Sequence, residues 1–232
     1  MKTIGLIGGM SWQSSRVYYD LLNEAVAAAR GGLHSAEILM RSVDFAGLEA
    51  LMRQNDWAMI ETRLGDEAAA LAAGGADCLL LCTNTMHKVF DGLTARVDIP
   101  FFHIADPLGQ ALARDGLARV GLLGTRFTMV EDFYATRLMA RFGIETIVPD
   151  ETQIAAIDQV IFAELCRGEV RDGSRDIYLG IMSDLASRGA EGIILGCTEI
   201  EMLVKPHHHP LPLYDTTRLH AEHAVAWALA DA

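Results

Sequence analysis

The sequence predicts an α/β protein of two similar lobes, each a mostly parallel sheet wrapped by helices, related by an internal pseudo-twofold duplication. Short apolar runs alternate with longer stretches of helical periodicity along all 232 residues. Such alternation is typical of parallel strands joined by crossover helices. Two pairs of segments also repeat at nearly constant spacing, which indicates a duplicated half of roughly 115 residues.

In the first half, apolar runs bounded by glycine, proline or polar residues predict strands, and apolar residues at helical spacing predict helices. Gly31 and Gly32 stop the first helix, and Gly74 and Gly75 stop the Ala-rich second one. The predicted strands are 3–8, 36–43, 78–82 and 101–104. The predicted helices are 12–30, 57–73, a short one after Thr85, and 107–114.

The second half follows the same order. The predicted strands are 120–124, 145–148, 192–196 and 211–214. The predicted helices are one through Arg141 ended by Gly143, then 154–167, 174–188, the first turns of one over 200–204, and 217–230. No Pro/Ser-rich linker separates the halves, so we expect closely packed lobes with the ligand at the carboxyl ends of the strands.

The internal repeat rests on two matches. Residues 75–85 align with residues 189–199, so Thr83 pairs with Cys197, 114 positions apart. Gly5 aligns with Gly121, 116 positions apart, and Tyr18 then matches Tyr134. Each match alone is weak because glycine-bounded apolar runs are common, but the near-equal spacing supports a duplication.

Composition excludes several classes of protein. The net charge is −12, from 19 basic and 31 acidic residues, which argues against nucleic-acid and anionic-membrane partners. Nothing approaches a transmembrane span, and the N-terminal apolar run is too short for a signal peptide. The cysteines at 78, 82, 166 and 197 show neither disulfide-rich nor zinc spacing, so a reducing cytoplasm is expected.

Polar side chains gather where four predicted strands end. These segments are 8–11, 83–85, 124–125 and 197–199. Each provides backbone N–H groups and small hydroxyls at a helix start, which suits a carboxylate or phosphate. The alternative is that the Ser, Thr and Asn residues are only N-caps. A nucleotide site is poorly supported because residues 5–9 do not give G-x-G-x-x-G and no P-loop pattern occurs.

Cys197 is the most reactive group among these segments. It lies between the apolar run 192–195 and a predicted helix starting at Ile200, and a helix N-terminus favours thiolate over thiol. A buried structural cysteine is the alternative. Matching residues in two lobes suit a two-sided reaction such as inversion of a stereocentre, in which a proton leaves one face of a carbon and another arrives opposite.

The chain resembles the cofactor-independent aspartate/glutamate racemase superfamily, in its aspartate racemase or broad-specificity amino-acid racemase branch. The opening Gly8-Gly9-Met10, Cys-Thr-Asn-Thr-Met-His at 82–87 and Gly-Cys-Thr-Glu at 196–199 carry the resemblance, which covers essentially the whole chain. It implies one lobe of residues 1–104 plus 216–232, another of 105–215, and an active site in the cleft between them. It also implies an amino-acid substrate, a homodimer, and neither pyridoxal phosphate nor metal.

The resemblance further implies roles for individual residues. Cys197 would be the acid/base on one face, taking the α-proton of the L-enantiomer, and Thr83 would occupy the opposite position. Asn84, Thr85 and Thr198 would hold the α-carboxylate with helix-start N–H groups. The other substrate-binding residues would be Gly9, Met10, Ser11, Thr125, Glu164 and Glu199.

Two positions depart from the family pattern. Members usually carry a cysteine where this chain has Thr83, whose hydroxyl cannot easily hold a negative charge at neutral pH. Cys82 comes one residue early, and we expect it to point into the packing because strand side chains alternate. Strict aspartate racemases tend to carry a lysine near the position of Glu164. Glu164 would instead repel the side-chain carboxylate of the substrate. The alternative is that Glu164 is simply a solvated helix residue.

One histidine and one run of three histidines have alternative interpretations. His87 lies one turn into a helix beside the site, as a supporting residue or a plain cap. Adjacent His207, His208 and His209 have poor metal-ligand geometry, so a structural loop is expected.

The sequence therefore predicts a cytoplasmic amino-acid racemase without cofactor, using Cys197. One alternative is a single-cysteine relative, a decarboxylase or cis-trans isomerase of a dicarboxylic acid. Another is a two-lobed binding protein with no chemistry.

Overall fold

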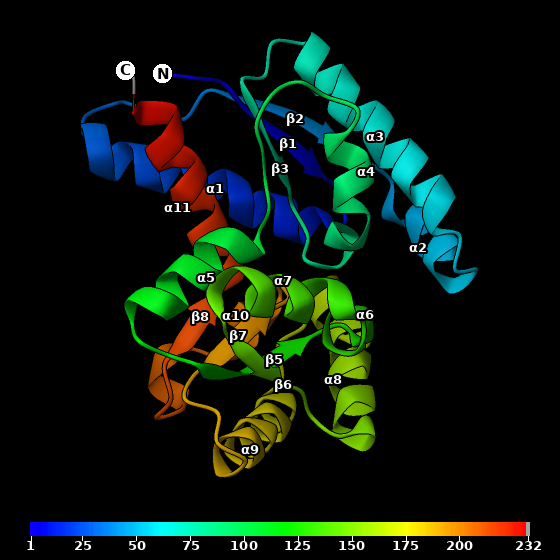
Figure 1. Ribbon diagram of the computed structural model, residues 1–232, viewed down its shortest axis with the longest axis vertical. Coiled ribbons are helices and arrows are strands. Elements are labelled where there is room, and N and C mark those ends of the chain that lie inside the picture. The colour runs from blue at the N-terminus through cyan, green and yellow to red at the C-terminus, as the bar shows by residue number, and fades with distance from the viewer. Residues whose placement is uncertain (231–232) are drawn as a thin grey trace. The chain divides into compact units, whose positions relative to one another are not determined.

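A computed structural model describes residues 1–230 of the chain (Figure 1). The chain divides into two compact units. Unit 1 consists of Met1–His103 together with the C-terminal segment from His220, and unit 2 is Ile104–Leu219. Within the described residues, each unit contains one four-stranded parallel sheet.

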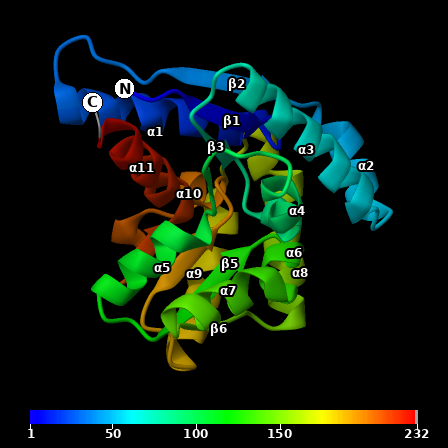
Figure 2. The same ribbon diagram turned by 45° about the horizontal axis from the view of Figure 1, so that its top comes forward.

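The sheet of unit 1 has the strand order β2-β1-β3-β4. Its strands are β1 Ile4–Gly8, β2 Ile38–Ser42, β3 Cys78–Leu81 and β4 Phe101–Phe102. Its helices are α1 Trp12–Arg30, α2 Phe45–Arg53, α3 Trp57–Ala73, the 3₁₀ helix η1 Thr85–Val89, α4 Phe90–Thr94, and most of α11 Thr216–Leu229. In Figures 1 and 2, α11 lies beside α1, whereas α2, α3 and α4 lie together elsewhere on the unit.

The sheet of unit 2 has the order β6-β5-β7-β8. Its strands are β5 Arg119–Gly124, β6 Glu145–Ile147, β7 Ile193–Gly196 and β8 Leu213–Asp215. Its helices are α5 Ala105–Arg114, α6 Arg126–Val130, α7 Asp132–Phe142, α8 Glu151–Ala163, α9 Asp172–Ser187 and α10 Ile200–Leu203, with 3₁₀ turns η2 Leu165–Arg167 and η3 Pro206–His208. Helix α5 packs on α7, and α8 packs on α9.

The two units share one topology, which confirms the predicted α/β fold and its duplication. Gly5 of β1 pairs with Leu79 of β3, and Gly121 of β5 pairs with Ile193 of β7. These are the residues that the two sequence matches align. A Cβ at Gly5 would lie 2.6 Å from a Leu79 methyl, and one at Gly121 would lie 2.7 Å from an Ile193 methyl. Both central strands therefore pack closely against the neighbouring strand at matched glycine positions.

The helices differ from the prediction in three places. Helix α2 was not predicted, although Asp44 caps it by accepting a hydrogen bond from the Ala46 N–H at 3.3 Å. The stretch after β5 forms two helices that meet at Glu131, whose backbone is extended. The predicted helix over 154–167 ends at Ala163, and residues 165–167 form a 3₁₀ turn.

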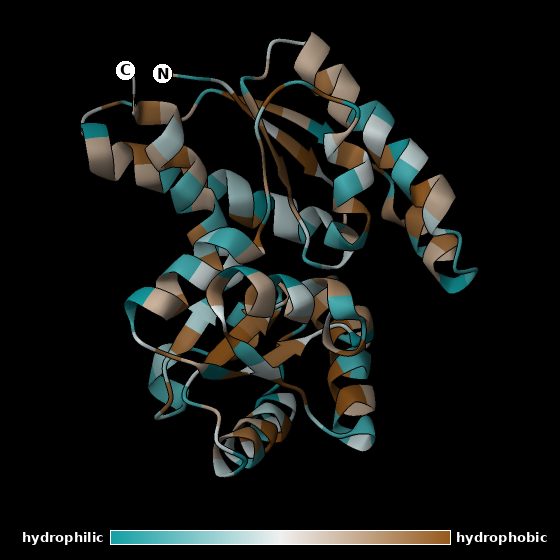
Figure 3. Ribbon diagram, in the orientation of Figure 1, coloured by the Kyte–Doolittle hydropathy of each residue, from teal (hydrophilic) through white to brown (hydrophobic). Residues whose placement is uncertain are grey.

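Each unit has its own apolar core, and the strands appear mainly brown in the hydropathy view (Figure 3). The core of unit 1 joins β1 and β3 to apolar residues of α1 and α11, and that of unit 2 surrounds β5 and β7. Among residues 1–230, no helix combines the length and apolar character needed to cross a bilayer.

Tyr18 and Tyr134, the matched tyrosines of the repeat, are both fully buried but differ in hydrogen bonding. The Tyr18 hydroxyl lies 2.8 Å from His220 Nδ1, and His220 Nε2 lies 3.0 Å from the Phe102 carbonyl oxygen. Since a carbonyl only accepts, Nε2 donates to it, and Nδ1 forms the hydrogen bond with the Tyr18 hydroxyl. The Tyr134 hydroxyl has no hydrogen-bond partner within the described chain.

This difference predicts opposite effects of removing the two hydroxyls. Tyr18→Phe removes a hydrogen bond between two buried side chains, so we expect the free energy of unfolding to fall by about 1–3 kcal/mol. Tyr134→Phe removes an unpaired buried hydroxyl, so we expect the free energy of unfolding to stay unchanged or to rise by about 1 kcal/mol. Urea denaturation of both variants checks this. Equal losses for the two would contradict the hydrogen-bond assignment.

Candidate functional site

The strand-end site of unit 1 starts with the turn after β1. Gly9 has φ 93°, and a Cβ there would lie 2.2 Å from the Val43 carbonyl oxygen, so only glycine fits. The Gly9 N–H donates to Ser15 Oγ at 2.7 Å. Ser11 caps α1 by accepting from the Ser14 N–H at 3.3 Å. Met10 and Ser11 are both buried, so the predicted residues form a buried turn held by hydrogen bonds to the start of α1.

The second part of this site is the Thr83-Asn84-Thr85 turn after β3. All three residues are buried, with 8% exposure at Thr83. Ser14 Oγ of α1 donates to the Cys82 carbonyl oxygen at 2.8 Å, which ties this turn to the first one. Cys82 itself is fully buried in the core of unit 1. Its predicted direction into the packing is confirmed, and burial raises the pKa of its thiol far above the usual range.

A buried histidine cluster supports this turn. His87 Nδ1 lies 2.8 Å from the Thr83 carbonyl oxygen, so it donates its hydrogen there. The His87 ring stacks on Phe90 at 5.5 Å and meets His103 edge-on at 4.5 Å between ring centroids. The ring centroid of His220 lies 5.9 Å from that of His87. The sequence singled out only His87, because the other two histidines join it from distant positions without a local motif.

The strand-end site of unit 2 begins at Thr125, which caps α6. Its Oγ1 accepts from the Thr128 N–H at 3.4 Å. Gly124 pairs with Gly196 in the β5–β7 ladder, so the ends of these two strands are adjacent. Thr125, Cys197, Thr198 and Glu199 are all buried. The structure thus places the predicted strand-end residues of the second half at one edge of one sheet.

Glu199 is bonded to two thiols. Cys197 Sγ donates to Glu199 Oε2 at 3.0 Å, and Cys166 Sγ lies 3.9 Å from Glu199 Oε1. Cys166 belongs to η2, and it reaches the site from 33 positions away in sequence. The sequence analysis assigned Cys166 no role at this site. One carboxylate therefore contacts two thiols, of which Cys197 is buried and Cys166 is partly buried.

The expectation that Cys197 favours thiolate is wrong for this structure. Burial is the main factor that raises its pKa well above the usual value, and the neighbouring Glu199 raises it further. Helix α10 has only four residues, so its N-terminus offers little positive potential. The thiol therefore holds its proton, in contact with a carboxylate that can accept it.

Glu164 is not a solvated helix residue, which was one of the two predicted possibilities. Its side chain is 15% exposed and lies at the turn between α8 and η2. Ser174 Oγ donates to Oε2 at 2.6 Å, and Arg171 Nη1 lies 3.4 Å from Oε1. The charge of Glu164 is therefore compensated locally, which weakens its expected repulsion of a substrate carboxylate.

The histidine run has a structural use. His208 Nδ1 accepts from the Lys205 N–H at 3.0 Å, and His209 Nδ1 accepts from the Leu211 N–H at 3.2 Å. Ring nitrogens engaged in this way support the loop interpretation. Across the part of the chain that the structure describes, no group of three or more His, Cys, Asp or Glu side chains is arranged to hold a metal ion.

Comparison with known proteins identifies the family to which the chain belongs. The model of the family described as Asp/Glu/Hydantoin racemase matches residues 7–224. This match covers both units and all the strand-end segments.

Solved structures agree with that match. A crystal structure of a proposed Asp/Glu racemase from Yersinia pestis has a TM-score of 0.92 at 44% identity, covering 99% of this chain and 100% of that one. An aspartate racemase homologue from Pyrococcus horikoshii OT3 has a TM-score of 0.84 at 29% identity, covering 98% and 99%. The Picrophilus torridus aspartate racemase, at 18% identity, 98% and 94% coverage and a TM-score of 0.77, shows the fold alone.

Proposed function

Because this chain belongs to the Asp/Glu/hydantoin racemase family, we propose that it is an amino-acid racemase that uses Cys197 as acid and base and needs no cofactor. Family membership supports an isomerase, and the similar structures from Yersinia pestis and Pyrococcus horikoshii suggest aspartate, glutamate or a broader set of amino acids as substrates. The observation that carries the proposal is the buried Cys197 thiol, 3.0 Å from the Glu199 carboxylate.

Glu199 supplies the base that the Cys197 thiol lacks. When the substrate excludes water, the carboxylate takes the thiol proton and the thiolate formed removes the α-proton of the L-enantiomer. The abstracted proton stays on Cys197, and delivery of a second proton to the opposite face of the α-carbon completes the inversion. The second thiol, Cys166, steadies the shared carboxylate by its own contact with Oε1. Since the proton moves from Cys197 to Glu199 only after the substrate has bound, the free enzyme does not need to hold a thiolate at neutral pH.

Thr83 occupies the corresponding position in unit 1, and His87 holds its backbone. We assign Thr83 the delivery of a proton to the other face through a water molecule. His87 fixes the Thr83 carbonyl oxygen and so orients the hydroxyl. Asn84, Thr85 and Thr198 bind the α-carboxylate, and Gly9, Met10, Ser11, Thr125 and Glu164 complete the substrate site. Binding in a cleft between the lobes, a homodimer and a cytoplasmic location stay predictions.

The substitution of threonine for a second thiol favours one other candidate. A single-cysteine relative, such as a decarboxylase or a cis-trans isomerase of a dicarboxylic acid, needs an acid/base group on one face only.

Chiral chromatography of purified protein incubated with a panel of L-amino acids tests the proposed function. We expect the D-enantiomer of at least one substrate to accumulate to equal amounts of both forms. Turnover of malonate-like or maleate-like acids without racemisation would favour the single-cysteine candidate, and tight binding without turnover would favour a binding protein.

The Glu199–Cys197 pair predicts a change in pH dependence. With Glu199 present, kcat/KM should vary little near neutral pH because the proton stays within the pair. In Glu199→Gln the thiol must lose its proton to solvent, so activity at pH 7 should fall about 10²-fold or more. It should then recover by about tenfold per pH unit as pH rises toward the thiol pKa.

The same substitution removes a charge that raises the pKa of Cys197. Titration of the thiol by its ultraviolet absorbance should therefore show a lower pKa in the Gln variant, still above the usual value because Cys197 remains buried. Glu24→Gln, on the exposed face of α1, is the matched control. An unchanged pH profile in Glu199→Gln would exclude the carboxylate as the proton acceptor.

A further inference from the structure

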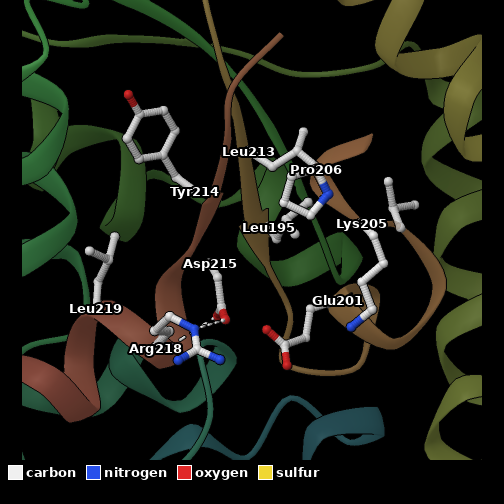
Figure 4. Close-up of a pocket in the computed structure, with 10 residues that line it drawn as sticks. Leu195, Glu201, Lys205, Pro206, Leu213, Tyr214, Asp215, Arg218 and Leu219 are labelled. Atoms are coloured by element: carbon white, nitrogen blue, oxygen red, sulfur yellow. Dashed lines mark hydrogen bonds and ion pairs between the residues drawn. The ribbon is translucent and has the colours of Figure 1, made fainter. Parts of the chain in front are cut away.

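One pocket lies entirely within unit 2 and contains none of the proposed catalytic residues. It has a volume of about 400 Å³, which is within the usual range for small-molecule sites. It opens beside the ends of β7 and β8, between α10 and the start of α11 (Figure 4). We call it the β7–β8 pocket. Its lining residues are Leu195, Glu201, Val204, Lys205, Pro206, Leu213, Tyr214, Asp215, Arg218 and Leu219.

The polar groups of this pocket gather on one side. In Figure 4 the carboxyl groups of Glu201 and Asp215 point toward one another, with the Arg218 guanidinium beside Asp215 and the Lys205 amine beside Glu201. Arg218 Nε lies 3.9 Å from Asp215 Oδ2. Leu213 and Pro206 lie on the other side, away from the carboxyl groups. The pocket is therefore divided into a charged end and an apolar end.

One acceptor at the charged end is left open. Asp215 Oδ1 accepts hydrogen bonds from the backbone N–H groups of Thr217 at 2.9 Å and Arg218 at 3.1 Å, which fixes the carboxylate in place. Its Oδ2 atom is buried and accepts no hydrogen bond of acceptable geometry from residues 1–230. A buried acceptor of this kind favours a ligand that brings a hydrogen-bond donor.

We propose that the β7–β8 pocket binds a free α-amino acid with an apolar side chain. The ammonium group lies between Asp215 and Glu201, the carboxylate meets Lys205 and Arg218, and the side chain fills the apolar end. Two cations and two carboxyl groups match the two opposite charges of such a zwitterion. Helix α10, which carries Glu201, begins directly after Cys197-Thr198-Glu199, so this ligand contacts the element that follows the catalytic segment.

Proton release gives this site a signature. Burial, followed by the neighbouring carboxyl group of Asp215, raises the pKa of Glu201 to about 8, while Lys205 and Arg218 act in the opposite direction. In the empty pocket Glu201 thus keeps its proton at neutral pH. An ammonium group prefers the ionised carboxylate, so binding releases that proton, and affinity should rise by up to about tenfold per unit from pH 6 toward pH 8.

Isothermal titration of the Cys197→Ser protein with L-leucine tests the proposal without turnover. We expect one binding event that weakens by about tenfold in Lys205→Met. In Glu201→Gln binding should persist without proton release, measured by repeating the titration in buffers of different ionisation enthalpy. Arg30→Met and Glu24→Gln remove matched exposed charges from α1 and should change nothing.

Two analogues separate the contributions of the charged groups. 4-Methylpentanoate lacks the ammonium group and isopentylamine lacks the carboxylate, so both should bind at least about tenfold more weakly than leucine. Leucine binding that is unaffected by Lys205→Met and Glu201→Gln would belong to another site and would overturn the proposal, as would the absence of any binding heat. Neither outcome bears on racemase turnover, which is measured separately on the unsubstituted protein.

Discussion

Cys197→Ser is expected to abolish turnover and leave the fold intact. Serine has nearly the shape of cysteine, and its hydroxyl can donate to Glu199 Oε2 as the thiol does at 3.0 Å. It is a far weaker acid, however, so Glu199 cannot convert it to a usable base. Removing a positioned acid/base group costs about 10²–10⁴-fold in rate. Chiral chromatography measures the loss, and urea denaturation measures stability.

Cys82→Ser provides a control with the opposite phenotype. Cys82 is fully buried in the core of unit 1, so a hydroxyl there should lower the free energy of unfolding by about 1–3 kcal/mol. It is not one of the proposed acid/base groups, so most activity should remain. If instead Cys197→Ser stays active, or Cys82→Ser is stable but inactive, the thiol has been assigned to the wrong residue.

Local sequence patterns were sufficient for the strands, because each central strand is an apolar run ended by glycine or a small polar residue. The repeat was also visible, since Gly5 and Gly121 need the same close packing against the neighbouring strand. Helix α2 was missed because nine residues give too little periodicity to recognise. The break at Glu131 was missed because two short helices in series resemble one longer helix.

The chemistry of the site depended on contacts that no local pattern contains. A helix-start rule predicted a low pKa for Cys197, but burial and Glu199 outweigh a four-residue helix. Cys166 meets Glu199 across 33 positions, and His220 meets Tyr18 across 202. Only the fold brings these groups together. Sequence therefore identified the strand-end residues, and tertiary structure decides their protonation.

The two units differ in the acid/base groups that they offer. Unit 2 has a thiol in contact with a carboxylate, whereas the matching position of unit 1 has Thr83, held by His87 through its backbone carbonyl. The two enantiomers have equal free energy in achiral solution, so kcat/KM must be equal in both directions. The asymmetry of the site must therefore appear in a measurement other than net turnover.

Isotope exchange is that measurement. In deuterated water, Cys197 should remove the α-proton of an L-substrate, exchange it with solvent through Glu199, and return a deuteron to the same face. We expect L-substrate to gain α-deuterium with retention faster than D-product forms. D-substrate should exchange little without inverting, because the Thr83 hydroxyl is a far weaker acid than a thiol. Proton NMR of the α-position, run alongside chiral chromatography, separates exchange from inversion.

Thr83→Cys should narrow the gap between the two enantiomers. The new thiol would sit at the end of β3 with its carbonyl still held by His87, and a thiol exchanges and delivers protons far better than an alcohol near neutral pH. D-substrate should then exchange with retention as well. Equal exchange and inversion from both enantiomers in the unsubstituted protein would show that Thr83, or a group acting in its place, is already a full partner, and the one-thiol account of this site would be wrong.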